Sequence, residues 1–269
     1  MFRILRPKCD VMKKNHFLLK SFTLGISATI MMLSCEKDGE NVKPQDAIVI
    51  SATGDITQKV NEFRQLVGEP LNTSVGQSSG RREINWDGVP DQFSSTSLPQ
   101  NFFNPIEAAA PEALKRGFVY GSTGDFRISN NSFSDLEPSH ANQFQSFSGA
   151  KVFANESAVL WDTKFELAGQ STPASVKAFG VVFSDVDLAN NSFLEFFDGD
   201  KSLGKYFATP HDDKTSFSFL GVYFKNEKVT RVSIGHGNGL LKPGEKDITN
   251  GGTSDLVVLD DFIYSEPAQ

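Results

Sequence analysis

The segment Ser192–Phe207, with the sequence SFLEFFDGDKSLGKYF, decides the fold class. Two runs rich in aromatic and aliphatic residues, Ser192–Phe197 and Ser202–Phe207, flank an Asp198-Gly199 pair. An Asp-Gly pair favours the tight turns whose twist matches that of antiparallel strands. The segment therefore predicts a β-hairpin with its turn at Asp198-Gly199.

Further short strands are expected on both sides of this hairpin, because alternating or continuous apolar runs recur with almost no helical spacing between them. The expected strands are Phe126–Ile128, Ala150–Phe153, Val159–Phe165, Val176–Phe183, Ser216–Phe224, Val229–Ile234 and Leu256–Tyr264. Strands at such short intervals predict an all-β fold, an antiparallel β-sandwich of the jelly-roll kind. The chain's 24 phenylalanine residues can fill the core of such a sandwich.

One short helix is expected before the strands. Ile56, Val60, Phe63 and Val67 are spaced as on one face of a helix that covers Ile56–Val67. The following residues, 68–110, are rich in Ser, Asn, Gly and Pro and predict long loops. Residues 56–267 are therefore expected to form a single β-sandwich domain with long N-terminal loops.

Residues 1–34 have the features of a bacterial lipoprotein signal peptide. Six basic residues among the first twenty precede the apolar stretch 17–33, and Met32-Leu33-Ser34-Cys35 resembles a lipobox. Lipid-modified Cys35 would then be the first mature residue and would hold the chain to a membrane, with residues 35–55 as a polar tether. The acidic stretch Glu36–Glu40 resembles that of lipoproteins sent to the outer membrane, so the expected location is the cell envelope. The alternative is an ordinary signal peptide with an incidental cysteine.

Composition and motifs disfavour several classes of function. The chain has a formal net charge of −7, and loss of the basic signal peptide would leave the remainder more acidic still. Nucleic acid is therefore not an expected partner, since phosphate backbones are bound by Lys and Arg patches. No His-Glu-x-x-His motif is present, and Gly76–Gly80, which matches Gly-x-Ser-x-Gly, lies in the expected loops at 68–110 and not between a predicted strand and a helix, so a serine or zinc hydrolase is not expected.

A cluster of polar residues around one tryptophan is the candidate ligand site. It consists of Arg81, Arg82, Glu83, Asn85, Trp86 and Asp87. An exposed Trp86 could stack on a sugar ring while its polar neighbours bind the hydroxyls. In the structural alternative, Trp86 fills one end of the sandwich and an arginine pairs with Glu83 or Asp87. A third hypothesis, a glycosidase, would use Glu83 and Asp87 as its carboxylate pair.

Two pairs of aspartates are candidate ligands of a structural calcium ion. Asp185 and Asp187 lie two residues apart, so an extended backbone places both carboxylates on one face. Asp260 and Asp261 are adjacent, so one of them is expected to point inward and to need a partner or a metal ion. The alternative is hydrogen bonding to loop amides or to an arginine. His211-Asp212-Asp213 and His236 are weaker candidates, interpreted as loop residues.

Five ordered segments resemble a family of exported bacterial proteins, many of which carry a PEP-CTERM-type sorting segment. They are Gly80–Asp91, Leu98–Phe103, Ala178–Asp187, Phe219–Phe224 and Val257–Tyr264. The resemblance implies export and a β-sandwich, and no particular activity. The sequence ends at Gln269 without the apolar sorting helix, so the lipid anchor is expected to replace it. Leu259–Phe262 is also similar to the last strand of jelly-roll carbohydrate-binding modules, where an Asp often binds structural calcium.

Taken together, these features predict a surface-anchored, non-catalytic lipoprotein whose β-sandwich binds glycans or other extracellular ligands. A structural or adhesive protein of the cell envelope is the alternative. A glycan-degrading enzyme is the third hypothesis.

Overall fold

The computed structural model describes residue 44 and residues 46–211 and 216–269, all of which belong to one compact unit. The predicted signal peptide, Cys35 and the Asp212-Asp213 pair lie outside the described residues. Within the described residues, no helix has the length and apolar character needed to span a membrane.

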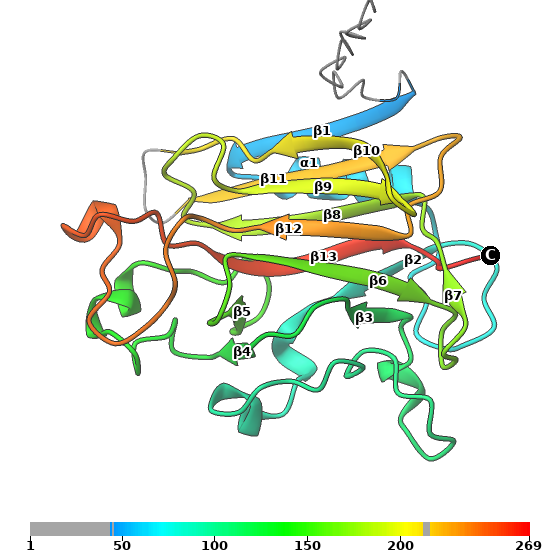
Figure 1. Cartoon of the computed structure of the whole chain (residues 1–269), viewed down its shortest axis with the longest axis horizontal. Coiled ribbons are helices and arrows are strands. Elements are labelled where there is room, and N and C mark those ends of the chain that lie inside the picture. The colour runs from blue at the N-terminus through cyan, green and yellow to red at the C-terminus, as the bar shows by residue number, and fades with distance from the viewer. Residues whose placement is uncertain (1–43, 45, 212–215) are drawn as a thin grey trace, which may run out of the picture. The chain divides into compact units, whose positions relative to one another are not determined.

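The described chain is a sandwich of two antiparallel β-sheets (Figure 1). The seven-stranded sheet has the order β1-β11-β8-β13-β5-β4, and β2 also pairs with β13. Its strands are β1 (Ala47–Gly54), β2 (Arg81–Ile84), β4 (Phe126–Ser129), β5 (Val152–Asn155), β8 (Ala178–Ser184), β11 (Phe217–Phe224) and β13 (Val258–Ser265).

The six-stranded sheet has the order β10-β9-β12-β6-β3, and β7 pairs with β6. Its strands are β3 (Phe118–Tyr120), β6 (Leu160–Glu166), β7 (Pro173–Ala174), β9 (Phe193–Asp198), β10 (Lys201–Phe207) and β12 (Arg231–Gly235). From β5 onward the chain passes repeatedly between the two sheets, as in a jelly roll. The predicted all-β antiparallel sandwich is confirmed.

The helical segments are short. They are α1 (Thr57–Val67) and the 3₁₀ turns η1 (Trp86–Gly88), η2 (Asp91–Ser94), η3 (Glu112–Leu114), η4 (Pro138–Asn142) and η5 (Ile248–Asn250). The predicted helix is therefore confirmed, and its apolar positions Val60, Phe63 and Val67 are buried.

The hairpin predicted from the opening segment is present as β9 and β10, with its turn one residue later than expected. Asp198 pairs with Lys201, so Gly199 and Asp200 are the two turn residues. Gly199 has a φ of 58°, a conformation that glycine adopts without steric cost.

Strand β1 corrects the prediction that residues 35–55 form only a tether. Ala47–Gly54 pairs along its whole length with β11 at the edge of the seven-stranded sheet. Ile48 and Val49 remain exposed on this edge strand, and Ile50 is its buried apolar residue. The expected loops at 68–110 likewise contain β2, whose partner β13 lies almost 180 residues later in the chain.

A pair of glycines allows α1 to pack closely on the outer face of the seven-stranded sheet. Gly180 of β8 and Gly221 of β11 are direct cross-strand partners, and the ring of Phe63 lies over both. A Cβ atom at either position would lie 2.7 Å from an atom of that ring, so a larger residue would push the helix outward. This layer also includes Val60, Ala178, Val182, Phe219 and Ile263.

Gly221→Ala is expected to lower the free energy of unfolding by about 1–3 kcal/mol, because the new methyl group overpacks the Phe63 ring. Chemical denaturation of the purified chain measures this loss. Gly88→Ala is the matched control, since a Cβ there meets no atom within 4 Å. Equal stabilities of the two variants would contradict the packing described here.

Candidate functional site

The outer face of the six-stranded sheet combines aromatic and charged side chains. Side chains alternate along a strand, so Leu194 and Phe196 of β9 enter the core while Phe193, Glu195 and Phe197 point outward. The same rule places further side chains on this face, from β6, β10 and β12. They are Asp162, Lys164, Lys205, Phe207 and Arg231.

Two phenylalanine rings on this face lie against cations. The Arg231 guanidinium carbon is 3.6 Å from the centre of the Phe197 ring, and Lys205 Nζ is 4.2 Å from that of Phe193. Cation–π contacts of this kind contribute about 0.5–1 kcal/mol each at exposed positions. Phe207 remains 40% exposed beside Phe193, with the two ring centres 6.0 Å apart. The face therefore offers an accessible ring next to ordered charges.

Ion pairs and hydroxyl groups hold these charges in place. Arg231 Nη1 lies 3.3 Å from an Asp162 carboxylate oxygen and donates to Ser233 Oγ at 3.0 Å. Ser233 Oγ in turn donates to the other Asp162 oxygen. Lys205 pairs with Glu195 at 3.2 Å in the same manner. A planar donor and a carboxylate acceptor thus lie side by side in a fixed arrangement.

A groove of about 990 Å³ begins at the Asp162–Arg231 pair and follows the end of the sheet where β9 turns into β10. This is the end at which the C-terminal residues lie (Figure 1). Its polar lining includes Lys164, Asp200 and Lys228, and its apolar lining includes Phe165, Pro173 and Ala174. The groove therefore presents both hydrogen-bonding groups and apolar surface, as sites for small polar ligands do.

Trp86 is not available to a ligand, which corrects the prediction of a sugar platform at this residue. Its side chain is completely buried and stacks on Phe153, with ring centres 4.0 Å apart and planes 4° from parallel. Phe103 and Phe262 contact its ring edge-on. The structural alternative, in which Trp86 fills the sandwich, is the one that the geometry supports.

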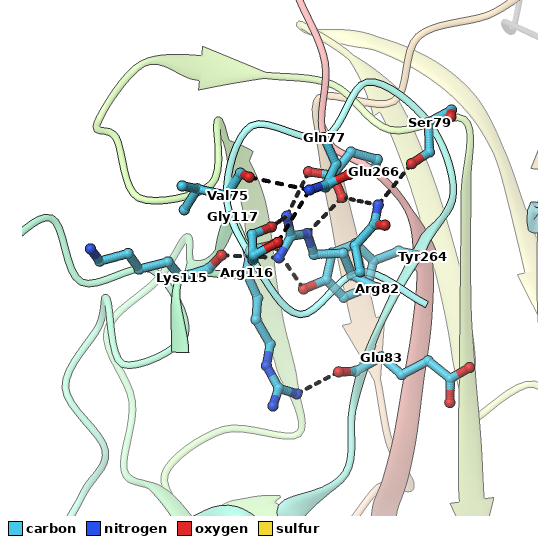
Figure 2. Close-up of polar contacts among 12 residues, drawn as sticks. Val75, Gln77, Ser79, Arg82, Glu83, Lys115, Arg116, Gly117, Tyr264 and Glu266 are labelled. Atoms are coloured by element: carbon cyan, nitrogen blue, oxygen red, sulfur yellow. Dashed lines mark hydrogen bonds and ion pairs between the residues drawn. The ribbon is translucent and has the colours of Figure 1, made fainter. Parts of the chain in front are cut away.

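Arg82 is also buried, and it holds the loop before β2 in place (Figure 2). Its guanidinium binds both carboxylate oxygens of Glu266, at 2.7 and 2.8 Å. It also donates to the carbonyl oxygens of Ser74 and Lys115. Asn72 adds a 2.8 Å hydrogen bond to the same Glu266 carboxylate. Arg82 therefore has a structural role with Glu266 as its partner, while the expected pairing of an arginine with Glu83 is made by Arg81.

The other members of the predicted cluster are used within the fold or point to solvent. Glu83 pairs with Arg81 at 2.6 Å and with Arg64 of α1 at 2.9 Å. Asp87 accepts a 2.7 Å hydrogen bond from the Ala150 amide, and Asn85 is exposed. These contacts assign Glu83 and Asp87 to loop and helix attachment, which leaves the glycosidase hypothesis without support from their geometry.

The four predicted metal ligands lie in two separate parts of the structure. Asp185 and Asp187 lie together and are joined by Asp247, a residue that the sequence did not single out. Asp260 and Asp261 form a separate pair on β13, where the register with β8 shifts between Leu259 and Phe262. This bulge inserts one residue, so the expectation that the two carboxylates point to opposite faces is wrong.

Asp260 and Asp261 both face the loop at Phe147 and Ser148. Asp260 accepts hydrogen bonds from the amides of both loop residues, at 2.5 and 3.2 Å. Asp261 accepts from Ser148 Oγ at 2.5 Å and pairs with Arg64 at 3.1 Å. These are the loop amides and the arginine of the metal-free alternative. Burial and the neighbouring Asp261 charge raise the pKa of Asp260 above its ordinary value.

His236 lies in the core, directly after the last residue of β12. Its side chain is buried and its Nδ1 lies 3.0 Å from the carbonyl oxygen of Val257. Burial lowers the pKa of this imidazole, which favours the neutral form. His211 follows β10 and its amide donates to the Val186 carbonyl at 2.8 Å.

The outer-face residues and Asp247 are the functional candidates that sequence reasoning missed. The alternation in SFLEFF could have assigned Phe193, Glu195 and Phe197 to the outer face, but it does not say that Arg231 and Asp162 lie beside them. Asp247 could not be found, because no local pattern links it to a strand that ends more than 60 residues earlier.

Comparison with known proteins identifies no family. No protein-family model and no curated protein matches the chain. A solved family 29 carbohydrate-binding module, in complex with mannohexaose, is similar at 7% sequence identity and a TM-score of 0.29. The similarity covers 71% of this chain and 95% of the module. What this chain binds must therefore be inferred from its own geometry.

Asp260→Asn is expected to reduce the loss of stability between pH 5 and pH 8. Because the pKa of Asp260 is raised in the folded state, its carboxyl group stays protonated up to a higher pH there than in the unfolded chain, where its pKa is near 3.8. The stabilisation is complete below that unfolded value and is lost as the pH rises through the raised one. The asparagine variant does not ionise, so its loss should be smaller by about 1–3 kcal/mol.

Denaturant unfolding of both chains at the two pH values, with a chelator present, measures this difference. Asp91→Asn is the control, since Asp91 is exposed and pairs with Lys151 at the surface. Identical pH dependence in the parent chain and in Asp260→Asn would show that Asp260 ionises freely in the fold.

Proposed function

We propose that this chain is a non-catalytic lipoprotein whose β-sandwich binds glycans on the outer face of its six-stranded sheet. The observation that carries the proposal is the Asp162–Arg231 pair, which lies over Phe197 and opens into the groove. The carboxylate can accept a hydrogen bond from one sugar hydroxyl, while the planar guanidinium beside it donates to the neighbouring hydroxyl. The apolar lining of the groove can contact the C–H face of the ring.

The shape of the site favours an extended ligand. The groove lies along the end of a sheet, between the β9–β10 turn and the Pro173–Ser175 segment. Its charged lining groups are of both signs, with Lys164 and Lys228 alongside Asp162 and Asp200. Mixed polarity of this kind fits a ligand rich in hydroxyl groups better than a fatty acid or a polyanion. An oligosaccharide is therefore the proposed ligand class.

The lipid anchor belongs to the proposal as well. It rests on the sequence around Cys35, where a basic segment and an apolar stretch precede the lipobox-like residues. Attachment by acyl chains at Cys35 would hold the sandwich at the surface of a membrane, in the cell envelope. A surface-anchored glycan-binding protein can keep a cell close to polysaccharide without changing it chemically.

A glycan array probed with the purified chain tests the binding function. At least one oligosaccharide should bind saturably, and Arg231→Ala should weaken its binding by roughly 10- to 100-fold, the loss of a charge-assisted hydrogen bond. Lys59→Ala is the matched control, because Lys59 is an exposed cation on α1 that pairs with Glu62. It should leave the affinity unchanged.

Thermal melting of each variant separates lost binding from lost folding, since Arg231 also covers Phe197. If no oligosaccharide binds, or if folded Arg231→Ala keeps full affinity, the proposed site is wrong. A structural or adhesive role in the envelope would then be the better account of the chain.

A further inference from the structure

Three loops meet at the end of the sandwich opposite the groove. Asp185 and Asp187 follow β8, η4 lies in the loop between β4 and β5, and Asp247 precedes η5 in the loop between β12 and β13. Figure 1 shows the green loop after β4 and the orange loop after β12 at the same end of the molecule. Gln143 joins two of these loops through a 2.9 Å hydrogen bond to Thr249 Oγ1.

The three aspartates each direct one carboxylate oxygen to a common point. These oxygens all lie within 4.8 Å of one another. Calcium binds oxygen at 2.3–2.6 Å, so two ligands on opposite sides of the ion are roughly 4.6–5.2 Å apart. The observed spread fits within that limit. Asp185 and Asp247 are buried and Asp187 is half-buried, so the point lies beneath the protein surface.

One oxygen of Asp185 has no hydrogen-bond partner among the described residues, although Asp185 is only 1% exposed. Its Oδ2 accepts from Gln143 Nε2, whereas its buried Oδ1 accepts from no group in this part of the chain. A buried carboxylate oxygen without a partner costs about 1–3 kcal/mol or more, so native proteins rarely retain one without a ligand. Asp185 also has a φ of 71°, in the left-handed region that residues other than glycine rarely adopt.

The negative charges around Asp185 also favour a bound cation. Asp187, Asp247 and Asp255 bring three further carboxylates close to it. Asp255 is itself buried, and its carboxylate accepts from the amides of Asp187 and Leu188 at 3.2 and 3.1 Å. Four carboxylates thus lie close together at this end of the fold. A bound cation would offset their mutual repulsion.

We propose that Asp185, Asp187 and Asp247 bind one calcium ion that ties the loop after β8 to the loop before β13. An all-oxygen donor set disfavours zinc, which prefers nitrogen and sulfur ligands. Loop-borne carboxylates suit the flexible coordination of calcium better than the strict octahedron of magnesium. This site is independent of the glycan groove. It keeps two of the four ligands expected from the sequence and replaces Asp260 and Asp261 by Asp247.

Calcium titration of the full chelator-treated chain, followed by calorimetry and by thermal melting, tests the site. One calcium ion per chain should bind, and it should raise the melting temperature more than the same concentration of magnesium does. Asp185→Asn should weaken calcium binding by at least about tenfold and abolish the thermal response. The variant should fold without calcium, since asparagine has nearly the size of aspartate and removes one negative charge from the cluster.

A second variant guards against an indirect effect of Asp185→Asn on folding. Asp187→Asn, at the less buried ligand, should also weaken binding, whereas Asp91→Asn at an exposed position should bind calcium as the parent does. The proposal is overturned if the parent chain binds no calcium at millimolar concentration. It is equally overturned if Asp185→Asn and Asp187→Asn bind calcium with the affinity of the parent.

Discussion

The packing of Phe262 between the two sheets is the contact on which the rest of the structure depends. Its ring contacts Phe153 and Phe179 of its own sheet and Phe118 and Trp161 of the opposite one, with ring centres 5.6–6.2 Å apart. Trp86 packs edge-on against it at 5.1 Å. Residues 36–269 contain no cysteine, so no disulfide can replace this packing. Aromatic pairs of this kind contribute about 0.5–1.5 kcal/mol each beyond their buried area.

This use of aromatic residues determines where binding can occur. Both tryptophans of the chain lie in the core, so the residues best suited to stacking on sugars are not available to a ligand. The outward positions of β9 and β10 carry phenylalanine instead, next to the charged groups of β6 and β12. The composition of that outer face thus follows from the alternation of side chains along each strand. One face of each strand fills the core, and the other carries the side chains of the proposed glycan site.

Local pattern was enough to predict the fold class, the helix and the β9–β10 hairpin, because each follows from residues close in sequence. It failed for β1, because this strand pairs with β11, whose residues lie more than 160 positions later in the sequence. It also failed for the orientation of Asp260 and Asp261, because a bulge in β13 depends on the register with β8. The site residues were the hardest to predict. Arg231 and Asp162 are 69 residues apart, and only the pairing of β12 with β6 brings them together.

The role of the Trp86 cluster was also beyond what local sequence pattern could predict. Arg82, Trp86 and Glu83 have the composition of a sugar site, yet composition does not say which side chains are buried. Pairing of β2 with β13 turns Arg82 toward Glu266 and places Trp86 over Phe153. The same residues therefore attach a long loop to the core, and the proposed glycan site lies on a face of the other sheet.

Quenching of tryptophan fluorescence by acrylamide tests the aromatic core most directly, because Trp86 and Trp161 are the only two tryptophans in the chain. The folded protein should show blue-shifted emission that acrylamide quenches weakly, and a bound oligosaccharide should leave the quenching unchanged. Red-shifted emission that is strongly quenched in the folded state, or quenching that a glycan prevents, would place an indole at the surface and contradict this account.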